Sequence, residues 1–152
     1  MAHAFENTLY AMDYPLPVKL GNQLLAHLPI QLKELSDEIN TSQYMLQFGD
    51  NWDGEGSMSY SPKTWMNAIT FICNYANWVF EHYNHVIPIP NIYHGPKGSI
   101  DFYWEKETFN LLINFPKEDN AVASFYGDNY STQRVEGHFN PLKFQNLYNR
   151  CS

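Results

Sequence analysis

The residues that could do chemistry fall into three groups along the sequence. The first is an acidic turn at residues 51–56, where Asp53 and Glu55 follow Asp50. Several carboxylates on one loop suit a hard cation such as Ca²⁺, which takes about six to eight oxygen ligands. The spacing does not match the calcium-loop pattern D-x-[DN]-x-[DN]-G, and Asp-Gly is by itself a strong turn signal. The sequence therefore favours a structural turn over a metal site.

Histidines form the second group. His82 and His85 lie near the end of an expected helix, and His94 follows after a connector. Two histidines three positions apart on a helix can share a metal ion. However, the H-E-x-x-H pattern is absent, and histidine near a helix C-terminus is also favoured by the helix dipole. A small metal-dependent hydrolase using Asp53/Glu55 or His82/His85/His94 is kept as the alternative to a non-enzymatic protein.

The third group is a pair of carboxylates, Asp101 and Glu105, which share one face of an expected strand with Tyr103. Paired carboxylates can do general acid–base catalysis, but carboxylates on the wet face of a sheet are far commoner. The sequence contains no phosphate-binding loop and no serine nucleophile elbow. Cys73 lies on an apolar helix face and is expected to be buried and unreactive. We therefore expect no catalytic residue, no bound metal and no cofactor.

A long central helix is the element that organises these groups. Ser61 is a good N-cap, and Pro62 suits the first helical position. Apolar and aromatic residues then recur at helical spacing to about Asn84. Because the apolar stripe is wide, we expect a sheet on one side of this helix and the N-terminal segment on another. Before it, the sequence predicts a short helix over residues 20–28 and an amphipathic helix over residues 30–41.

The sequence pattern of the second half of the chain predicts a β-sheet. An extended, proline-rich connector at residues 86–90 is followed by four runs with period-two alternation, which short polar turns separate. This pattern is typical of an antiparallel meander. The last run is the most polar and is expected at the edge. The four runs are Ser99–Glu105, Phe109–Phe115, Ala121–Tyr126 and Ser131–Phe139.

These elements predict one α+β domain over residues 1–152, in which the central long helix packs on a four-stranded antiparallel meander. N-terminal helices and a short C-terminal helix complete it. The expected parts are an arm and helices at 1–48, the turn and central helix at 49–85, the meander at 98–139, and a final helix at 141–150.

Composition limits the classes of partner. The chain has 9 basic and 16 acidic residues and a formal net charge of −7, and its cations are scattered. Direct binding of nucleic acid is therefore not expected. Polar residues such as Asn67 and Glu81 interrupt the longest apolar helix, so no membrane span is expected. Two cysteines and the lack of a signal-peptide pattern predict a cytoplasmic protein.

The order of motifs resembles a family of small uncharacterised bacterial proteins. They carry an Asn-Trp-Asp-Gly turn, a helix, a proline-rich connector and a strand of the form Gly-x-Ile-x-x-x-Trp-Glu. Here these are residues 51–54, the helix from Pro62, residues 86–90 and residues 98–105. The likeness covers roughly the last two-thirds of the chain. Such proteins resemble accessory members of mobile-element, toxin–antitoxin or CRISPR-associated defence loci, and they carry no established chemistry.

The resemblance and the lack of a catalytic constellation together predict a regulatory accessory protein. It would act, antitoxin-like, by masking or inhibiting another protein encoded nearby. Aromatic residues with a polar tip build such interfaces well, and the aromatic share of the chain is 16 %. The polar run at residues 131–139 could also pair with a partner strand. The expected partner-binding residues are Trp52, Asp53, Tyr103, Glu105 and Tyr130.

Overall fold

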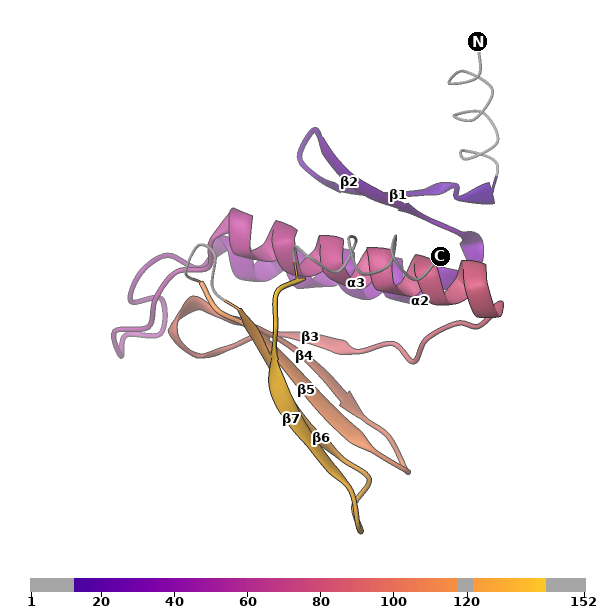
Figure 1. Ribbon diagram of the computed structural model, residues 1–152. Helices are drawn as coiled ribbons and strands as arrows, with labels where there is room; N and C mark the ends of the chain where they lie inside the picture. Colours follow the sequence, from indigo (N-terminus) through magenta and orange to yellow (C-terminus); the bar gives the residue numbers. More distant parts are fainter. Residues whose placement is uncertain (1–12, 118–121, 142–152) are drawn as a thin grey trace.

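The computed structural model describes residues 13–117 and 122–141. This part of the chain forms a β-hairpin, two α-helices and a five-stranded antiparallel sheet (Figure 1), which confirms an α+β fold. The expected N-terminal arm up to residue 12 and the final helix beyond Pro141 lie outside the described residues. Among the described helices, none combines the length and apolar character that a membrane crossing needs.

The predicted helix over residues 20–28 is wrong, because this segment belongs to the hairpin. Strand β1 (Leu16–Leu20) pairs antiparallel with β2 (Gln23–Leu28), and Gly21 turns the chain with φ at 59°. Leucines four residues apart fit one face of a helix, and they equally fit alternate positions of a strand. The Gly-Asn pair between two apolar runs is the feature that indicates a two-residue hairpin turn.

The amphipathic helix predicted over residues 30–41 is confirmed. It consists of a 3-10 turn, η1 (Ile30–Leu32), continued by α2 (Lys33–Ser42), and a second 3-10 turn, η2 (Gln43–Gln47), follows. Pro29 stands immediately before η1, where a missing backbone N–H costs no helical hydrogen bond. The apolar side chains of α2 are buried while Lys33, Glu34 and Asp37 are exposed, so α2 is a surface helix with one packed face.

The central helix has the predicted bounds. Helix α3 (Pro62–Tyr83) begins after Ser61, whose hydroxyl oxygen accepts from the Lys63 N–H at 3.2 Å. It ends at Asn84, which adopts the left-handed conformation with φ at 49°. The fully buried side chains of α3 form its apolar stripe: Trp65, Ala68, Ile69, Ile72, Cys73 and Ala76.

Helix α3 lies between the hairpin and the sheet (Figure 1). On the hairpin side, the Asn77 amide donates to the carbonyl of His27 in β2 at 2.9 Å. On the sheet side, the ring of Phe71 packs 5.8 Å from that of Phe115. These contacts confirm that a sheet covers the helix on one side and the N-terminal segment covers it on another.

The sheet has five strands, and not the predicted four. The four predicted runs are confirmed as its last four strands, and a short strand that begins directly after Pro90 adds a fifth. That strand has four residues, too few for alternation to stand out beside a proline-rich connector. The 3-10 turn η3 (Pro96–Gly98) joins it to the next strand. The strands, each antiparallel to its neighbour, are β3 (Asn91–His94), β4 (Ile100–Glu105), β5 (Asn110–Phe115), β6 (Ala123–Asp128) and β7 (Arg134–Phe139).

The two faces of the sheet differ sharply in burial. On β4, Ile100, Phe102 and Trp104 are buried toward the helices, as alternation predicted. The intervening side chains point the other way and are half-buried or exposed. We call the side that the described helices do not occupy the open face. The register places on it Asn91, Tyr93, Asp101, Tyr103, Glu105, Asn110, Leu112, Asn114, Ser124, Tyr126, Asp128, Arg134, Glu136 and His138.

The two edge strands of the sheet have different surroundings. At β3, the Ile92 N–H donates to the Glu38 carboxylate of α2 at 2.8 Å, so a helix closes this edge. Strand β7 forms the opposite edge, as its polar sequence predicted. Charged residues on an edge strand discourage unspecific pairing with other chains. The open face and the β7 edge are therefore contiguous surface.

Candidate functional site

The acidic turn is held together by its own side chains. Asp53 Oδ1 accepts from the backbone N–H groups of Glu55 at 2.9 Å and Ser57 at 3.3 Å, and the Ser57 hydroxyl donates to Asp53 Oδ2. Asn51 Oδ1 accepts from the Gly56 N–H at 2.7 Å. The Ser57 hydroxyl, followed by the backbone donors, lowers the pKa of Asp53. The Asp53 carboxylate therefore shapes the turn.

A second set of bonds fastens the turn to the sheet. Asp50 Oδ1 accepts from the Ser59 N–H at 2.9 Å, and this bond is the main reason that the pKa of Asp50 is lowered. Lys117, just beyond β5, donates through Nζ to the Ser59 carbonyl at 2.8 Å and to its hydroxyl at 3.0 Å. Its own carbonyl accepts from the Thr64 hydroxyl at 3.3 Å. The turn is thus tied to both the sheet and α3.

Trp52 belongs to an aromatic cluster beside this turn. Its ring stacks on Phe48 with centroids 4.4 Å apart and planes 14° apart, and it meets His94 edge-on at 5.4 Å. Tyr44 and Tyr60 complete the cluster around His94, each with its ring centroid 5.9 Å away. Trp52 Nε1 is buried and has no acceptor in the described part of the chain. These contacts give Trp52 a packing role.

The three histidines considered for a metal site have separate surroundings. The His94 Nδ1 atom shares a 2.9 Å hydrogen bond with the Tyr44 hydroxyl. His82 Nδ1 donates to the Trp78 carbonyl at 3.0 Å, and His85 lies in the exposed connector. Within residues 13–117 and 122–141, no three or more His, Cys, Asp and Glu side chains gather as a metal site would require. The structure does not bring these three histidines together, although the ring of His94 packs against Trp52 of the acidic turn.

Three of the predicted binding residues do come together on and beside the open face. Tyr103 and Glu105 project from β4, and the Tyr130 hydroxyl reaches back to donate to the carbonyls of Lys106 at 2.9 Å and Phe109 at 3.2 Å. Partial desolvation raises the pKa of Tyr103, and the nearby Glu105, Tyr130 and Asp128 add to the effect. Trp52 and Asp53 lie in the acidic turn, so the five residues predicted to bind a partner divide into two groups.

Asp101 also lies on the open face, in the cross-strand row that contains Tyr93, Asn114, Ser124 and His138. The Asn114 amide nitrogen donates to Asp101 Oδ1 at 2.7 Å and to the Ser99 hydroxyl at 2.9 Å. Burial raises the pKa of Asp101, although the Asn114 bond and the neighbouring His94 oppose this shift. Asp101 and Glu105 share a face as predicted, with Tyr103 between them on the strand.

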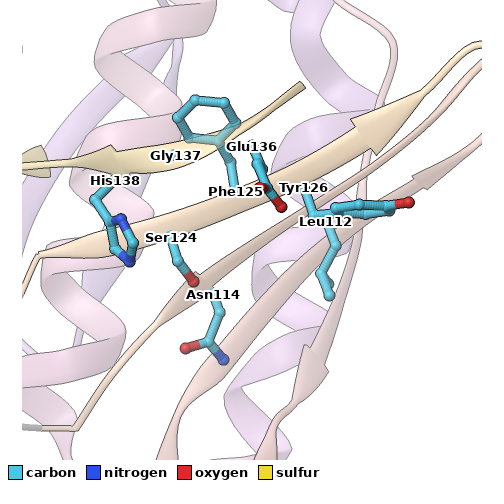
Figure 2. A pocket seen from close by; sticks show the side chains of 8 residues that line it. All are labelled: Leu112, Asn114, Ser124, Phe125, Tyr126, Glu136, Gly137 and His138. Atoms are coloured by element: carbon cyan, nitrogen blue, oxygen red, sulfur yellow. The ribbon is translucent and has the colours of Figure 1, made fainter. Parts of the chain in front are cut away.

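A hollow on the open face brings together residues that the sequence reasoning did not single out. It has a volume of about 480 Å³ and lies over β5, β6 and β7 (Figure 2). The sequence of a single strand does not mark any of these residues as part of a site. The pairing register between the strands brings their side chains together. Alternation along β6 and β7 was the signal that could have placed them on one face. The residues that line the hollow are Leu112, Asn114, Ser124, Phe125, Tyr126, Glu136, Gly137 and His138.

A second, larger hollow of about 830 Å³ lies between α3 and the inner face of the sheet. Aromatic and aliphatic side chains line it, among them Tyr75, Trp104 and Phe125. The Trp104 indole N–H already donates to the Pro88 carbonyl at 2.7 Å. Its lining is predominantly apolar, with Tyr75 and Asn140 as the polar side chains among the described residues that line it.

Comparison of the chain with protein-family models, with curated proteins and with solved structures finds no match.

Proposed function

We propose that this chain is a non-enzymatic accessory protein that binds another protein through the open face and thereby masks a basic surface of that partner. The observation that carries this proposal is the charge of the face. Four carboxylates project from it, those of Asp101, Glu105, Asp128 and Glu136, against the one guanidinium of Arg134. Such a surface attracts a cationic partner and repels nucleic acid.

The tyrosines of this region support a protein partner in particular. Tyr93 and Tyr126 on the open face and Tyr130 beside it are 49 %, 41 % and 54 % exposed. Tyrosine contributes a large apolar ring and a polar tip at low conformational cost, and it is enriched at the centre of protein interfaces. Charged and aromatic groups mixed on one twisted sheet fit a folded partner or an extended segment lying across the strands.

The hydrolase alternative has less support from the geometry. The Asp53 carboxylate is engaged by three donors of its own turn. His82 and His94 have different hydrogen-bond partners in different elements. A general base or metal ligand needs a lone pair directed toward a place where a substrate or ion can sit. The geometry therefore favours the binding proposal over this alternative.

The biological setting of the proposal comes from the family resemblance. Accessory proteins of defence and mobile-element loci suggest a partner encoded nearby, in the cytoplasm, whose basic surface contacts nucleic acid. An acidic face can occupy such a surface in competition with the nucleic acid. The proposal predicts that the complex is salt-sensitive, because complementary charges steer its formation.

Affinity capture from the native host tests this function. The tagged full-length protein should recover a basic partner in stoichiometric amount. The double variant Glu105→Lys/Glu136→Lys, which changes the open face, should lose it. A matched control, Glu34→Lys/Glu55→Lys, makes the same change of net charge at exposed positions in α2 and the acidic turn. The proposal would be contradicted if both double variants lose the partner, if both retain it, or if the wild-type protein captures no basic partner.

A further inference from the structure

The hollow on the open face has an unusual balance of hydrogen-bonding groups. The side-chain amide nitrogen of Asn114 donates hydrogen bonds to the Ser99 hydroxyl and to the Asp101 carboxylate. The side-chain carbonyl oxygen of Asn114 therefore remains free to accept. Beside it in the same cross-strand row lies Ser124, whose hydroxyl oxygen can also accept. The Tyr126 hydroxyl and the His138 imidazole, which also line the hollow, can accept as well as donate, so every free polar group at this point can accept a hydrogen bond.

Glu136 adds a charged acceptor to the hollow. Its carboxylate is exposed and makes no hydrogen bond or ion pair with any residue of the described segments. The nearest cation along the strand, Arg134, stands opposite Asp128 in the register. Glu136 itself stands opposite Tyr126, so a carboxylate and an aromatic ring flank the hollow together (Figure 2).

We infer that this hollow binds an arginine side chain presented by the partner protein, a step that rests on the proposed function. A guanidinium has five N–H donors and no acceptor, which complements a site in which the Glu136 carboxylate and the Asn114 oxygen only accept and the other polar groups can accept. Its planar fork pairs with a carboxylate through two parallel bonds, and its face stacks on a tyrosine ring. Glu136, Tyr126 and Asn114 supply these three kinds of contact.

The size and charge of the hollow agree with this occupant. A volume of about 480 Å³ exceeds one side chain, so an arginine can enter with part of its own backbone. Leu112 lines the hollow beside Tyr126, its cross-strand partner, and can pack against the aliphatic stem of the arginine. Lysine would keep the charge but would lose the planar stacking and the paired bonds.

The direct test uses N-acetyl-arginine amide, titrated into the ¹⁵N-labelled full chain and followed by backbone amide shifts. Saturable shifts centred on Ser124, Tyr126 and Glu136 are expected. Lysine amide acetylated on its α-nitrogen, which keeps the side-chain charge, should bind roughly tenfold more weakly than the arginine probe, because an ammonium group cannot form the two parallel bonds to a carboxylate. The citrulline analogue, which has the same shape without the charge, should bind weakly or not at all.

Two variants locate the site. Glu136→Gln preserves size and should weaken binding of the arginine probe by about tenfold or more, since the charge-assisted bonds are lost. Glu34→Gln removes an exposed carboxylate of α2, away from the open face, and should leave binding unchanged. Amide spectra of both variants report whether the fold is intact. Absence of shifts around the hollow, equal binding of the three probes, or equal loss in both variants would overturn the inference.

The outcome is separable from that of the proposed function. If the partner is captured through the open face while the arginine probe fails to bind, the arginine site is wrong and the proposed function stands. If the probe binds at the hollow but no basic protein is captured, the proposed function is wrong and the arginine site stands.

Discussion

The indole N–H of Trp65 donates to the hydroxyl of Ser42 at 2.9 Å, inside the contact between α3 and α2. That hydroxyl in turn donates to the Ile39 carbonyl at 2.7 Å. Trp65 is fully buried and Ser42 is 1 % exposed, so no water can replace either bond. One buried serine thus satisfies the only polar atom of the largest buried side chain and fixes the position of α2 on the central helix.

Replacing this serine should destabilise the protein measurably. Ser42→Ala leaves the Trp65 indole N–H buried without a partner, which costs about 1–3 kcal/mol of unfolding free energy. Urea unfolding followed by tryptophan fluorescence measures the loss. Thr41→Ala, at the exposed neighbouring position of α2, is the control and should change stability by less than about 0.5 kcal/mol. Equal effects of the two substitutions would show that the buried bond contributes nothing specific.

The acidic turn should give stability a particular pH dependence. Hydrogen bonds hold the folded pKa of Asp53 below its usual 3.8, so its stabilising contribution is present above that value. This contribution is lost as the pH falls through the lowered folded pKa. Asp53→Asn removes the titrating group. The difference in unfolding free energy between wild type and variant should therefore be largest near neutral pH and shrink in acid.

Urea titrations at a series of pH values between about 2 and 7 give this difference directly. Glu55→Gln in the same turn is the control, because the Glu55 side chain makes no hydrogen bond within the described residues. If the difference in unfolding free energy between wild type and Asp53→Asn stays constant or widens in acid, the stability of the turn does not depend on the ionised carboxylate.

Cys73 should react only when the protein unfolds. The side chain is fully buried on α3, and burial raises the pKa of its thiol to about 12. The thiolate is the reactive species, so both access and ionisation protect this residue. In a Cys151→Ser background, labelling by an aromatic disulfide reagent at pH 8 should proceed at the rate of opening and be immediate in urea. Rapid labelling of the native protein would contradict this burial.

How far the sequence could predict the fold depended on whether the signals were local. Ser61 and Pro62 marked the start of α3, and a wide stripe of apolar residues carried it to Asn84, where the structure ends it. The hairpin at residues 16–28 was missed because leucine spacing fits two periods. Strand β3 was missed because a segment of four residues needs its partner strand to reveal it.

The site divides in the same way. Alternation within one strand was enough to place Asp101, Tyr103 and Glu105 on a common face. The hollow was beyond prediction, since it depends on β5, β6 and β7 pairing in one particular register. The spacing of His82, His85 and His94 suggested a shared site, but the ends of α3 and β3 give these residues different neighbours.

The pH dependence contributed by Asp101 should have the opposite sign to that of Asp53. Burial raises the folded pKa of Asp101, so the protonated form contributes stability that is fully present below the usual 3.8. That stability is lost as the pH rises through the raised folded pKa. Asp101→Asn keeps an oxygen that can accept from Asn114 and carries no charge, so it avoids this loss.

The unfolding free energy of Asp101→Asn minus that of wild type should consequently increase from about pH 3 to pH 7. Urea denaturation at each pH measures this difference, and subtraction cancels the other carboxylates that titrate in the same range. The amide can retain the bond to Asn114, so a uniform loss of stability at every pH would mean that the ionised form of Asp101 is needed. If the unfolding free energy of Asp101→Asn minus that of wild type falls as the pH rises, folding does not raise the pKa of Asp101.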